Sequence, residues 1–138
     1  MAKPKKYISR EIEFYEDDRG FYYLRTAEGE DITEEAVVRL NDWLAVHRAD
    51  LKEDRKPMLI ELAYGSTISA GVQSFLADSE HRLSTADAIL INTFAHKLMA
   101  TFYLRHYKPQ LPTRVFSDVF QALDWIEKQI NDDAVAGK

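Results

Sequence analysis

The sequence contains no cysteine, so disulfides, thiolate metal sites and catalysis by a thiol are all excluded. It also lacks long apolar runs, because none approaches the ~20 residues that a membrane-spanning helix needs. The basic start, residues 1–10, is not followed by an apolar segment long enough for a signal peptide. We therefore expect a cytoplasmic protein that is not integral to a membrane.

Sequence motifs for catalysis and metal binding are also missing. No G-x-S-x-G elbow, phosphate loop or dinucleotide glycine pattern occurs, so a triad of Ser69, His96 and Asp87 lacks its usual sequence context. None of the four histidines belongs to an H-x-x-x-H or H-x-H pair: His47, His81, His96 and His106. We expect no enzyme activity, no bound metal and no cofactor.

The composition is typical of one globular domain. The chain has 138 residues, of which 46% are hydrophobic and 30% are charged, and this is enough to build a core. The net charge of −5 argues against non-specific binding to nucleic acid. A basic cluster near the start is either a frayed terminus or an arm for an acidic partner; it consists of Lys3, Lys5, Lys6 and Arg10.

The first half of the chain predicts two strands and a helix. Residues 7–15 alternate apolar with polar positions, and residues 21–25 follow a turn, so the pair is expected to form a β-hairpin. A helix is expected to open at Asp31 with Glu34 in capping-box spacing, or at Thr33 as an alternative cap. Its apolar stripe includes Ala36, Val37, Leu40, Trp43, Leu44 and His47.

The second half predicts strands that alternate with helices. Residues 52–56 are expected to form a loop, after which strands are expected at 57–62, 88–92 and 113–116. Helices are expected at about 69–80, from Thr93 onward, and from Asp118 to about residue 130, with a loose tail at 131–138.

This element order, β-β-α-β-α-β-α-β-α, indicates an α/β fold with right-handed crossovers. We expect a mixed sheet of about five strands with helices packed on it, in a single domain over residues 1–138 with an ordered core at about 8–130.

Three segments carry a family resemblance: IELAYGSTISAGVQSFL, TADAILINTFAHKLMATFYL and LPTRVFSDVFQALDWI. With these segments the chain resembles the SpoIIAA-like (STAS/SEC14-like) family of small bacterial proteins, which is related to STAS-domain anti-sigma-factor antagonists. The resemblance implies a STAS-like fold and a regulatory, non-enzymatic role through protein binding. It also implies that Ser69 corresponds to the serine that a partner kinase phosphorylates in the antagonists.

The loop before the second predicted helix is therefore the first candidate site. Its members Ser66, Thr67, Ser69 and Gly71 are candidates for phosphorylation or partner contact. Ser69 has two interpretations: an N-cap that accepts a hydrogen bond from a free N–H, or a phosphosite favoured by the helix dipole.

The third predicted helix is the second candidate site, because its apolar residues cover much of its circumference. A helix that packs on a sheet needs only one apolar stripe, so the remaining apolar residues must be covered in another way. They are covered by internal packing, by a protein partner or homodimer, or by a lipid or small apolar ligand in a groove. The residues concerned are Phe75, Phe94, Leu98, Met99, Phe102 and Tyr103. The alternative function that follows is a SEC14-like module for an apolar ligand.

Overall fold

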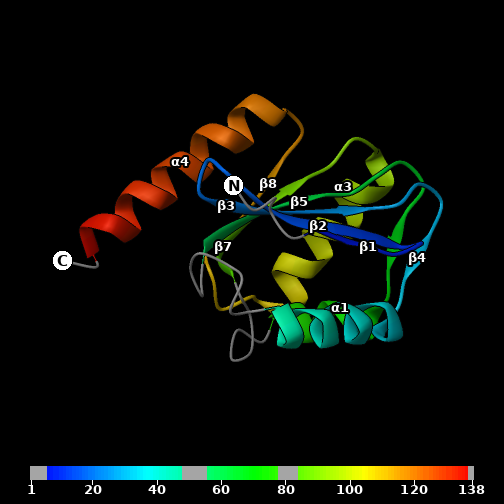
Figure 1. Cartoon of the computed structure of the whole chain (residues 1–138). Coiled ribbons are helices and arrows are strands. Elements are labelled where there is room, and N and C mark those ends of the chain that lie inside the picture. Colours follow the sequence, from blue (N-terminus) through cyan, green and yellow to red (C-terminus); the bar gives the residue numbers. More distant parts are fainter. Residues whose placement is uncertain (1–5, 48–55, 78–83, 137–138) are drawn as a thin grey trace.

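The computed structural model describes residues 6–47, 56–77 and 84–136, with side chains up to residue 132. A six-stranded sheet lies at its centre, in the order β1-β2-β3-β5-β7-β8, with helices on both faces (Figure 1). The strands are β1 (Lys6–Ile8), β2 (Ile12–Asp17), β3 (Phe21–Thr26), β5 (Lys56–Glu61), β7 (Ser84–Leu90) and β8 (Thr113–Phe116). The helices are α1 (Glu34–His47), α2 (Ala70–Ala77), α3 (Phe94–Phe102) and α4 (Val119–Ala136).

The sheet is mixed, as the sequence predicts. The meander β1-β2-β3 is antiparallel, whereas β3, β5, β7 and β8 are parallel to one another. The parallel strands end at one edge of the sheet, and each is followed by a helix that begins there. A two-stranded parallel ladder, β4 (Asp31–Ile32) with β6 (Thr67–Ile68), ties two of these connections together.

The first predicted strand is two strands in the structure, which raises the number in the main sheet from about five to six. The chain turns at Ser9, whose Oγ accepts hydrogen bonds from Glu11 N (3.3 Å) and Ile12 N (3.1 Å). Ser9 N also donates to Ile12 O at 2.8 Å. A side-chain oxygen replaces the glycine or proline that usually marks such a turn.

Several predicted boundaries differ from the structure. Helix α1 begins at Glu34 rather than Asp31, with Thr33 Oγ1 accepting from Ala36 N at 3.4 Å. Lys56 lies in β5 rather than in a loop, and its Nζ lies 2.6 Å from Glu16 Oε2 in a buried ion pair. The remainder of that predicted loop, residues 52–55, lies outside the described residues.

The later elements show smaller differences. Strand β7 occupies Ser84–Leu90, earlier than the predicted 88–92, whereas β8 occupies the predicted residues 113–116. Helix α4 continues to Ala136, so most of the tail that was expected to be loose is helical. Lys3, Lys5, the end of the second predicted helix at 78–80, and residues 137–138 lie outside the described residues.

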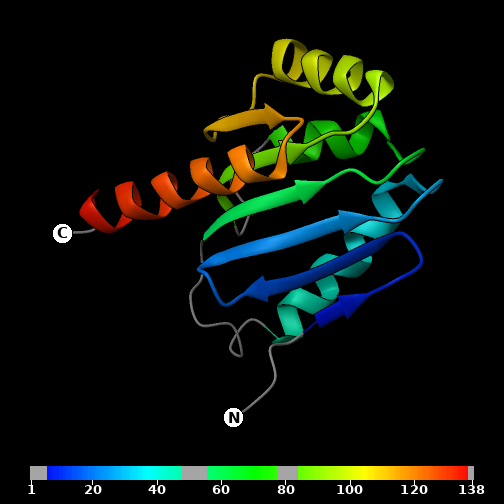
Figure 2. The same ribbon diagram turned by 90° about the horizontal axis from the view of Figure 1, so that it is seen from above.

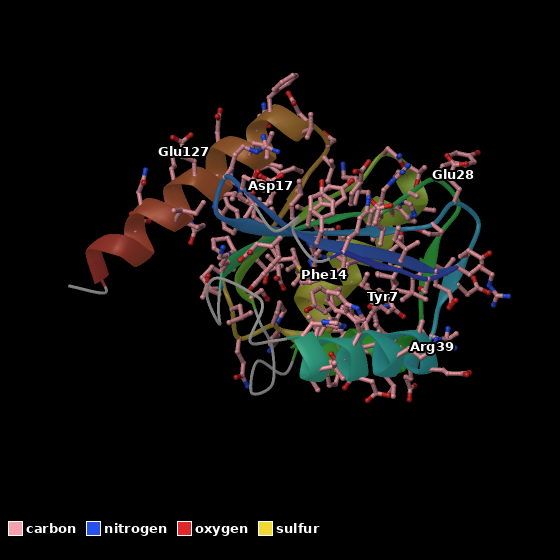
Figure 3. The ribbon with its side chains drawn as sticks, viewed as in Figure 1. Tyr7, Phe14, Asp17, Glu28, Arg39 and Glu127 are labelled. Atoms are coloured by element: carbon pink, nitrogen blue, oxygen red, sulfur yellow. The ribbon has the colours of Figure 1, made fainter. Side chains whose placement is uncertain are left out.

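Two hydrophobic layers hold the sheet between helices. On one face, Tyr7 and Phe14 point from β1 and β2 toward α1 (Figure 3), where the Trp43 ring centroid lies 5.7 and 6.3 Å from theirs. On the other face, Ala122 and Ile126 of α4 are buried against β5, β7 and β8. Figure 2 shows that α4 crosses the half of the sheet formed by the parallel strands, and Ile126 of this helix also packs with Phe21 at the start of β3.

Candidate functional site

The loop between β5 and α2 is fixed by a buried hydrogen-bond cluster centred on Ser66. The Ser66 side chain is only 2% exposed; its Oγ donates to Ala63 O at 2.8 Å and lies 2.8 Å from Thr26 Oγ1. Thr26 Oγ1 in turn accepts from Ala63 N at 2.9 Å. The hydroxyl of Ser66 therefore joins this loop to β3 and does not face solvent, unlike the partner-contact position expected from the sequence.

Ser69 stands at the start of α2 with its side chain in capping position. Its Oγ accepts from Val72 N at 3.2 Å, and its carbonyl oxygen accepts from Gln73 N at 3.0 Å. A Cβ added to Gly71 would lie 1.8 Å from Glu34 Oε1, so this glycine admits the Glu34 carboxylate beside the first turn of α2. Negative charge at that place interacts favourably with the helix dipole.

Thr67 is exposed, but its hydroxyl donates a hydrogen bond to the Asp31 carboxylate. A phosphate added to Thr67 or Ser69 would thus meet a carboxylate, Asp31 or Glu34, that already occupies the neighbourhood. Like charges at that separation oppose modification and weaken a phosphorylation switch.

His96 is buried at the first turn of α3, where Thr93 Oγ1 accepts from its main-chain N at 3.1 Å and caps the helix as predicted. Its Nε2 lies 2.8 Å from Ser66 O, so the histidine holds the loop rather than a hydroxyl nucleophile. Among the residues that the structure describes, no group of three or more His, Cys, Asp or Glu side chains has the arrangement of a metal site.

Helix α3 divides its apolar residues between the interior and the surface. Tyr103 is buried and Met99 is half-buried, and both pack in the core with α2. Phe94, Leu98 and Phe102 are 73%, 57% and 52% exposed. Residues four apart share one side of a helix, so these three form a continuous apolar line, here named the α3 ridge.

The α3 ridge continues into a π-helix, η2 (Tyr103–Tyr107), through a stacked ring pair. The ring centroids of Phe102 and His106 lie 4.8 Å apart with an interplanar angle of 14°. Phe75 of α2, the remaining candidate, is 38% exposed and lies beside α1 rather than on this ridge.

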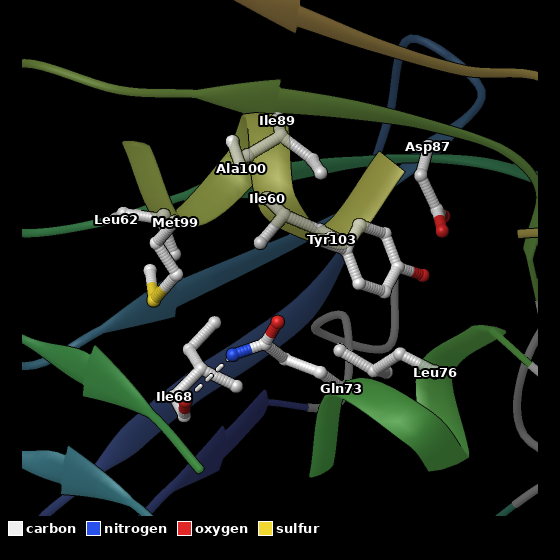
Figure 4. A pocket seen from close by; sticks show the side chains of 10 residues that line it. All are labelled: Ile60, Leu62, Ile68, Gln73, Leu76, Asp87, Ile89, Met99, Ala100 and Tyr103. Atoms are coloured by element: carbon white, nitrogen blue, oxygen red, sulfur yellow. Dashed lines mark hydrogen bonds between the residues drawn. The ribbon is translucent and has the colours of Figure 1, made fainter. Parts of the chain in front are cut away.

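Two adjoining cavities lie between the sheet and helices α1, α2 and α3. The smaller, about 30 Å³, has mostly apolar walls but includes Gln73, Asp87 and Tyr103 (Figure 4). Gln73 Nε2 donates to Ile68 O at 3.0 Å, while its buried Oε1 has no hydrogen-bond partner within the described residues. The volume suffices for one or two water molecules that would satisfy such a group.

The larger cavity, about 90 Å³, adjoins the first and is bounded by β2, β3, α1 and α2. The two cavities share the walls Ile60, Ile68 and Leu76. Together they approach the ~150 Å³ of an engineered apolar cavity that holds benzene. In this conformation they therefore suit a small apolar molecule rather than a long acyl chain.

The sheet face that α4 partly covers carries a polar pair that sequence patterns do not mark. The Tyr23 hydroxyl donates to the Glu61 carboxylate, and the Tyr15 and Tyr23 ring centroids lie 5.1 Å apart. Burial, together with this hydrogen bond to a carboxylate, raises the pKa of Tyr23 well above its usual value. Tyr23 therefore stays protonated and acts as a hydrogen-bond donor, not as a base.

The sheet order, the α-helices α1 to α4 and the loop after β5 together form a SpoIIAA-like α/β fold. The fold is similar to the crystal structure of an uncharacterized protein from the DUF3478 family with a SpoIIAA-like fold, from Shewanella loihica PV-4. The TM-score is 0.57 at 15% sequence identity, covering 91% of this chain and 98% of that chain. The SpoIIAA-like fold expected from the sequence is thus confirmed.

The chain belongs to the family described as Domain of unknown function (DUF7793), whose model matches residues 32–130. No curated protein matches the sequence. Within the described residues, no helix is both long and apolar enough to cross a membrane.

Proposed function

We propose that this chain is a non-enzymatic, cytoplasmic regulatory domain that acts by binding a protein, either a partner or a second copy, through the α3 ridge. The supporting observation is the exposure of Phe94, Leu98 and Phe102, each more than half accessible and aligned on one side of α3. Contiguous apolar side chains on the surface of a soluble domain usually mark an interaction site.

The charge near the ridge distinguishes it from the loop site. Lys97 and Arg105 are exposed on the same helical segment, whereas the neighbours of Ser69 are carboxylates. The ridge thus supplies apolar contact area, and the flanking cations supply orientation and selectivity.

The test replaces single ridge residues and measures association. Sedimentation of the wild type over a range of concentrations reports self-association, and affinity capture followed by binding measurements with each recovered protein reports a partner. Leu98→Lys is expected to weaken either association at least tenfold, while the matched surface variant Val46→Lys on α1, also highly exposed, leaves it unchanged. Association that survives both Leu98→Lys and Phe102→Ser would exclude the ridge.

The second candidate function is a module for a small apolar ligand, and the adjoining cavities of about 30 and 90 Å³ favour it. Ala100 is buried in the wall of the smaller cavity, so Ala100→Leu is expected to fill it. Loss of a ligand detected by native mass spectrometry in this variant, but not in Leu98→Lys, would support the cavity as the site.

A further inference from the structure

A groove of about 640 Å³ lies between α3 and β8, the last strand of the sheet. Figure 2 shows α3 beside this end of the sheet. Apolar side chains contribute Ile91, Leu104 and Val115, and Lys97 and Thr101 of α3 form part of the wall. Phe94, the first residue of the α3 ridge, also lines the groove, whereas Leu98 and Phe102 do not.

One side of the groove is an open strand edge. β8 pairs with β7 and ends the strand order, so its outer edge pairs with no other strand within the described residues. The carbonyl oxygens of Pro112 and Phe116 accept from Asp87 N (2.9 Å) and Ile91 N (2.8 Å). Because hydrogen-bonding groups alternate along a strand, the main-chain groups of Thr113 and Val115 point outward.

The groove also lies in the part of the chain that lacks acidic residues. Residues 88–117 contain four of the 18 Lys and Arg residues and none of the 23 Asp and Glu residues. The rest of the chain therefore has 14 basic and 23 acidic residues, a net charge of −9. Of the four cations, Lys97 lies in the groove wall and Arg114 lies on β8 itself.

We propose that this groove binds an extended, acidic segment of a partner protein, which adds to the sheet as a strand along β8. The main chain of the segment would bond with Thr113 and Val115, and its alternate side chains would enter the groove over Leu104 and Val115. Acidic side chains of the segment would meet Lys97. Strand addition obtains affinity from main-chain hydrogen bonds and selectivity from such side-chain positions.

The shortness of β8 sets the selectivity. The strand has four residues and follows Pro112, and both features limit non-specific pairing at a sheet edge. A partner must therefore add charge complementarity to a few main-chain bonds. A second copy that paired through its own β8 would place Arg114 and Lys97 near their equivalents, which disfavours that arrangement.

The test uses three synthetic eight-residue peptides with blocked ends. One alternates Val and Glu, one alternates Val and Lys, and one repeats the Val-Glu peptide with alternate main-chain nitrogens methylated. The Val-Glu peptide is expected to bind with a dissociation constant below about 1 mM and to shift the amide resonances of Thr113 and Val115. The Val-Lys and N-methylated peptides are expected to bind at least tenfold more weakly.

Three variants locate the binding. Lys97→Glu and Thr101→Trp change exposed side chains of the groove and are expected to weaken binding of the Val-Glu peptide at least fivefold. Lys128→Glu changes an exposed lysine of α4 by the same charge and is expected to leave the affinity unchanged. Far-ultraviolet circular dichroism and melting curves verify that each variant is folded.

Four outcomes would overturn the proposal: no binding of the Val-Glu peptide, equal binding of the Val-Lys peptide, no loss on N-methylation, or resonance shifts confined to Leu98 and Phe102. Binding of vesicles containing phosphatidylserine that competes with the peptide and is lost in Lys97→Glu would instead assign the surface to anionic lipid. The two proposals can fail separately, because Leu98→Lys and Phe102→Ser, which test the α3 ridge, change residues that do not line the groove.

Discussion

The loop before α2 and helix α3 both begin at the carboxyl edge of the parallel strands, yet their side chains differ in how far they interact within the chain. In the loop, the hydroxyls of Ser66, Thr67 and Ser69 all form hydrogen bonds within the chain. On α3, the apolar side chains of Phe94 and Leu98 extend into solvent. The hydroxyl-rich loop is thus held within the fold, whereas α3 leaves apolar area exposed, which is why the proposed binding surface is placed on α3.

The loop before α2 and the surface of α3 also differ in the sign of their nearby charges. Asp31 and Glu34 approach the loop, whereas α3 and β8 present Lys97 and Arg114. The acidic partner segment proposed above would therefore be repelled from the start of α2 and attracted to the side of α3. The following variants test this difference.

The largest effect is expected at Ser66. Ser66→Ala removes a buried hydroxyl that bonds both Ala63 O and Thr26 Oγ1, so it should lower the free energy of unfolding by about 1–3 kcal/mol. Urea unfolding measures the change, and Thr67→Ala, at an exposed hydroxyl, is the control with an expected change below about 0.5 kcal/mol. Equal effects in the two variants would contradict a structural role specific to Ser66.

The next effect is expected at the start of α2. Ser69→Ala removes the cap on Val72 N and should cost about 0.5–2 kcal/mol of stability in thermal unfolding. Ser69→Asp should be nearly neutral because aspartate also caps and its charge suits the helix N-terminus. The charge introduced by Ser69→Asp is repelled by the Glu34 carboxylate. The double variant Ser69→Asp/Glu34→Gln should therefore be more stable than Ser69→Asp alone.

The same pair of variants separates a cap from a switch. If Ser69 only caps the helix, wild type and Ser69→Asp should bind a partner equally. If the loop faces a partner, Ser69→Asp should keep its melting temperature and lose binding, because the added charge must be desolvated at the interface.

A smaller effect on stability is expected on the α3 ridge. Leu98→Lys changes an exposed side chain and should alter the free energy of unfolding by no more than about 0.5 kcal/mol. Met99→Lys places the same charge one residue along, at a half-buried position, and should destabilise by several-fold more. Comparable urea midpoints for the two variants would show that the ridge is packed rather than exposed.

The smallest effect concerns pH and lies far from both regions. A hydrogen bond from the Arg19 guanidinium lowers the pKa of Asp17 below its usual value of 3.8. The carboxylate thus contributes stability above that value and loses it as the pH falls through the lowered pKa. Asp17→Asn should be less stable by about 0.5 kcal/mol or less at pH 7, and the difference should shrink as the pH falls below 3.8 and the carboxylate is protonated. Asp18→Asn, at an exposed neighbour, is the control.

Elements with strong local signals were predictable from the sequence. Thr93 and Asp118 stand before helices that the structure contains, and residues 113–116 form the predicted strand. The turn at Ser9 was missed because a side-chain oxygen replaces the glycine or proline of an ordinary turn. The start of β7 was missed because buried Ser84 and Asp87 interrupt its apolar pattern.

The candidate site was predictable only as a set of residues. A helix that is apolar around most of its circumference does not reveal which side faces inward, so the separation of Met99 and Tyr103 from the ridge required the structure. The position of Ser66 depends on Thr26 and His96, which are 40 and 30 residues away in the sequence. Spacing rules cannot report contacts of that range.

The placement of the two tryptophans has a consequence for following the folding reaction. Trp43 belongs to the layer under α1, where the His47 ring lies 4.7 Å away, and Trp125 belongs to the layer under α4, against Phe116 at 5.8 Å. Each indole therefore reports on one side of the sheet. Variants that retain a single tryptophan would show whether the two layers lose their fluorescence signals at one denaturant concentration or in sequence.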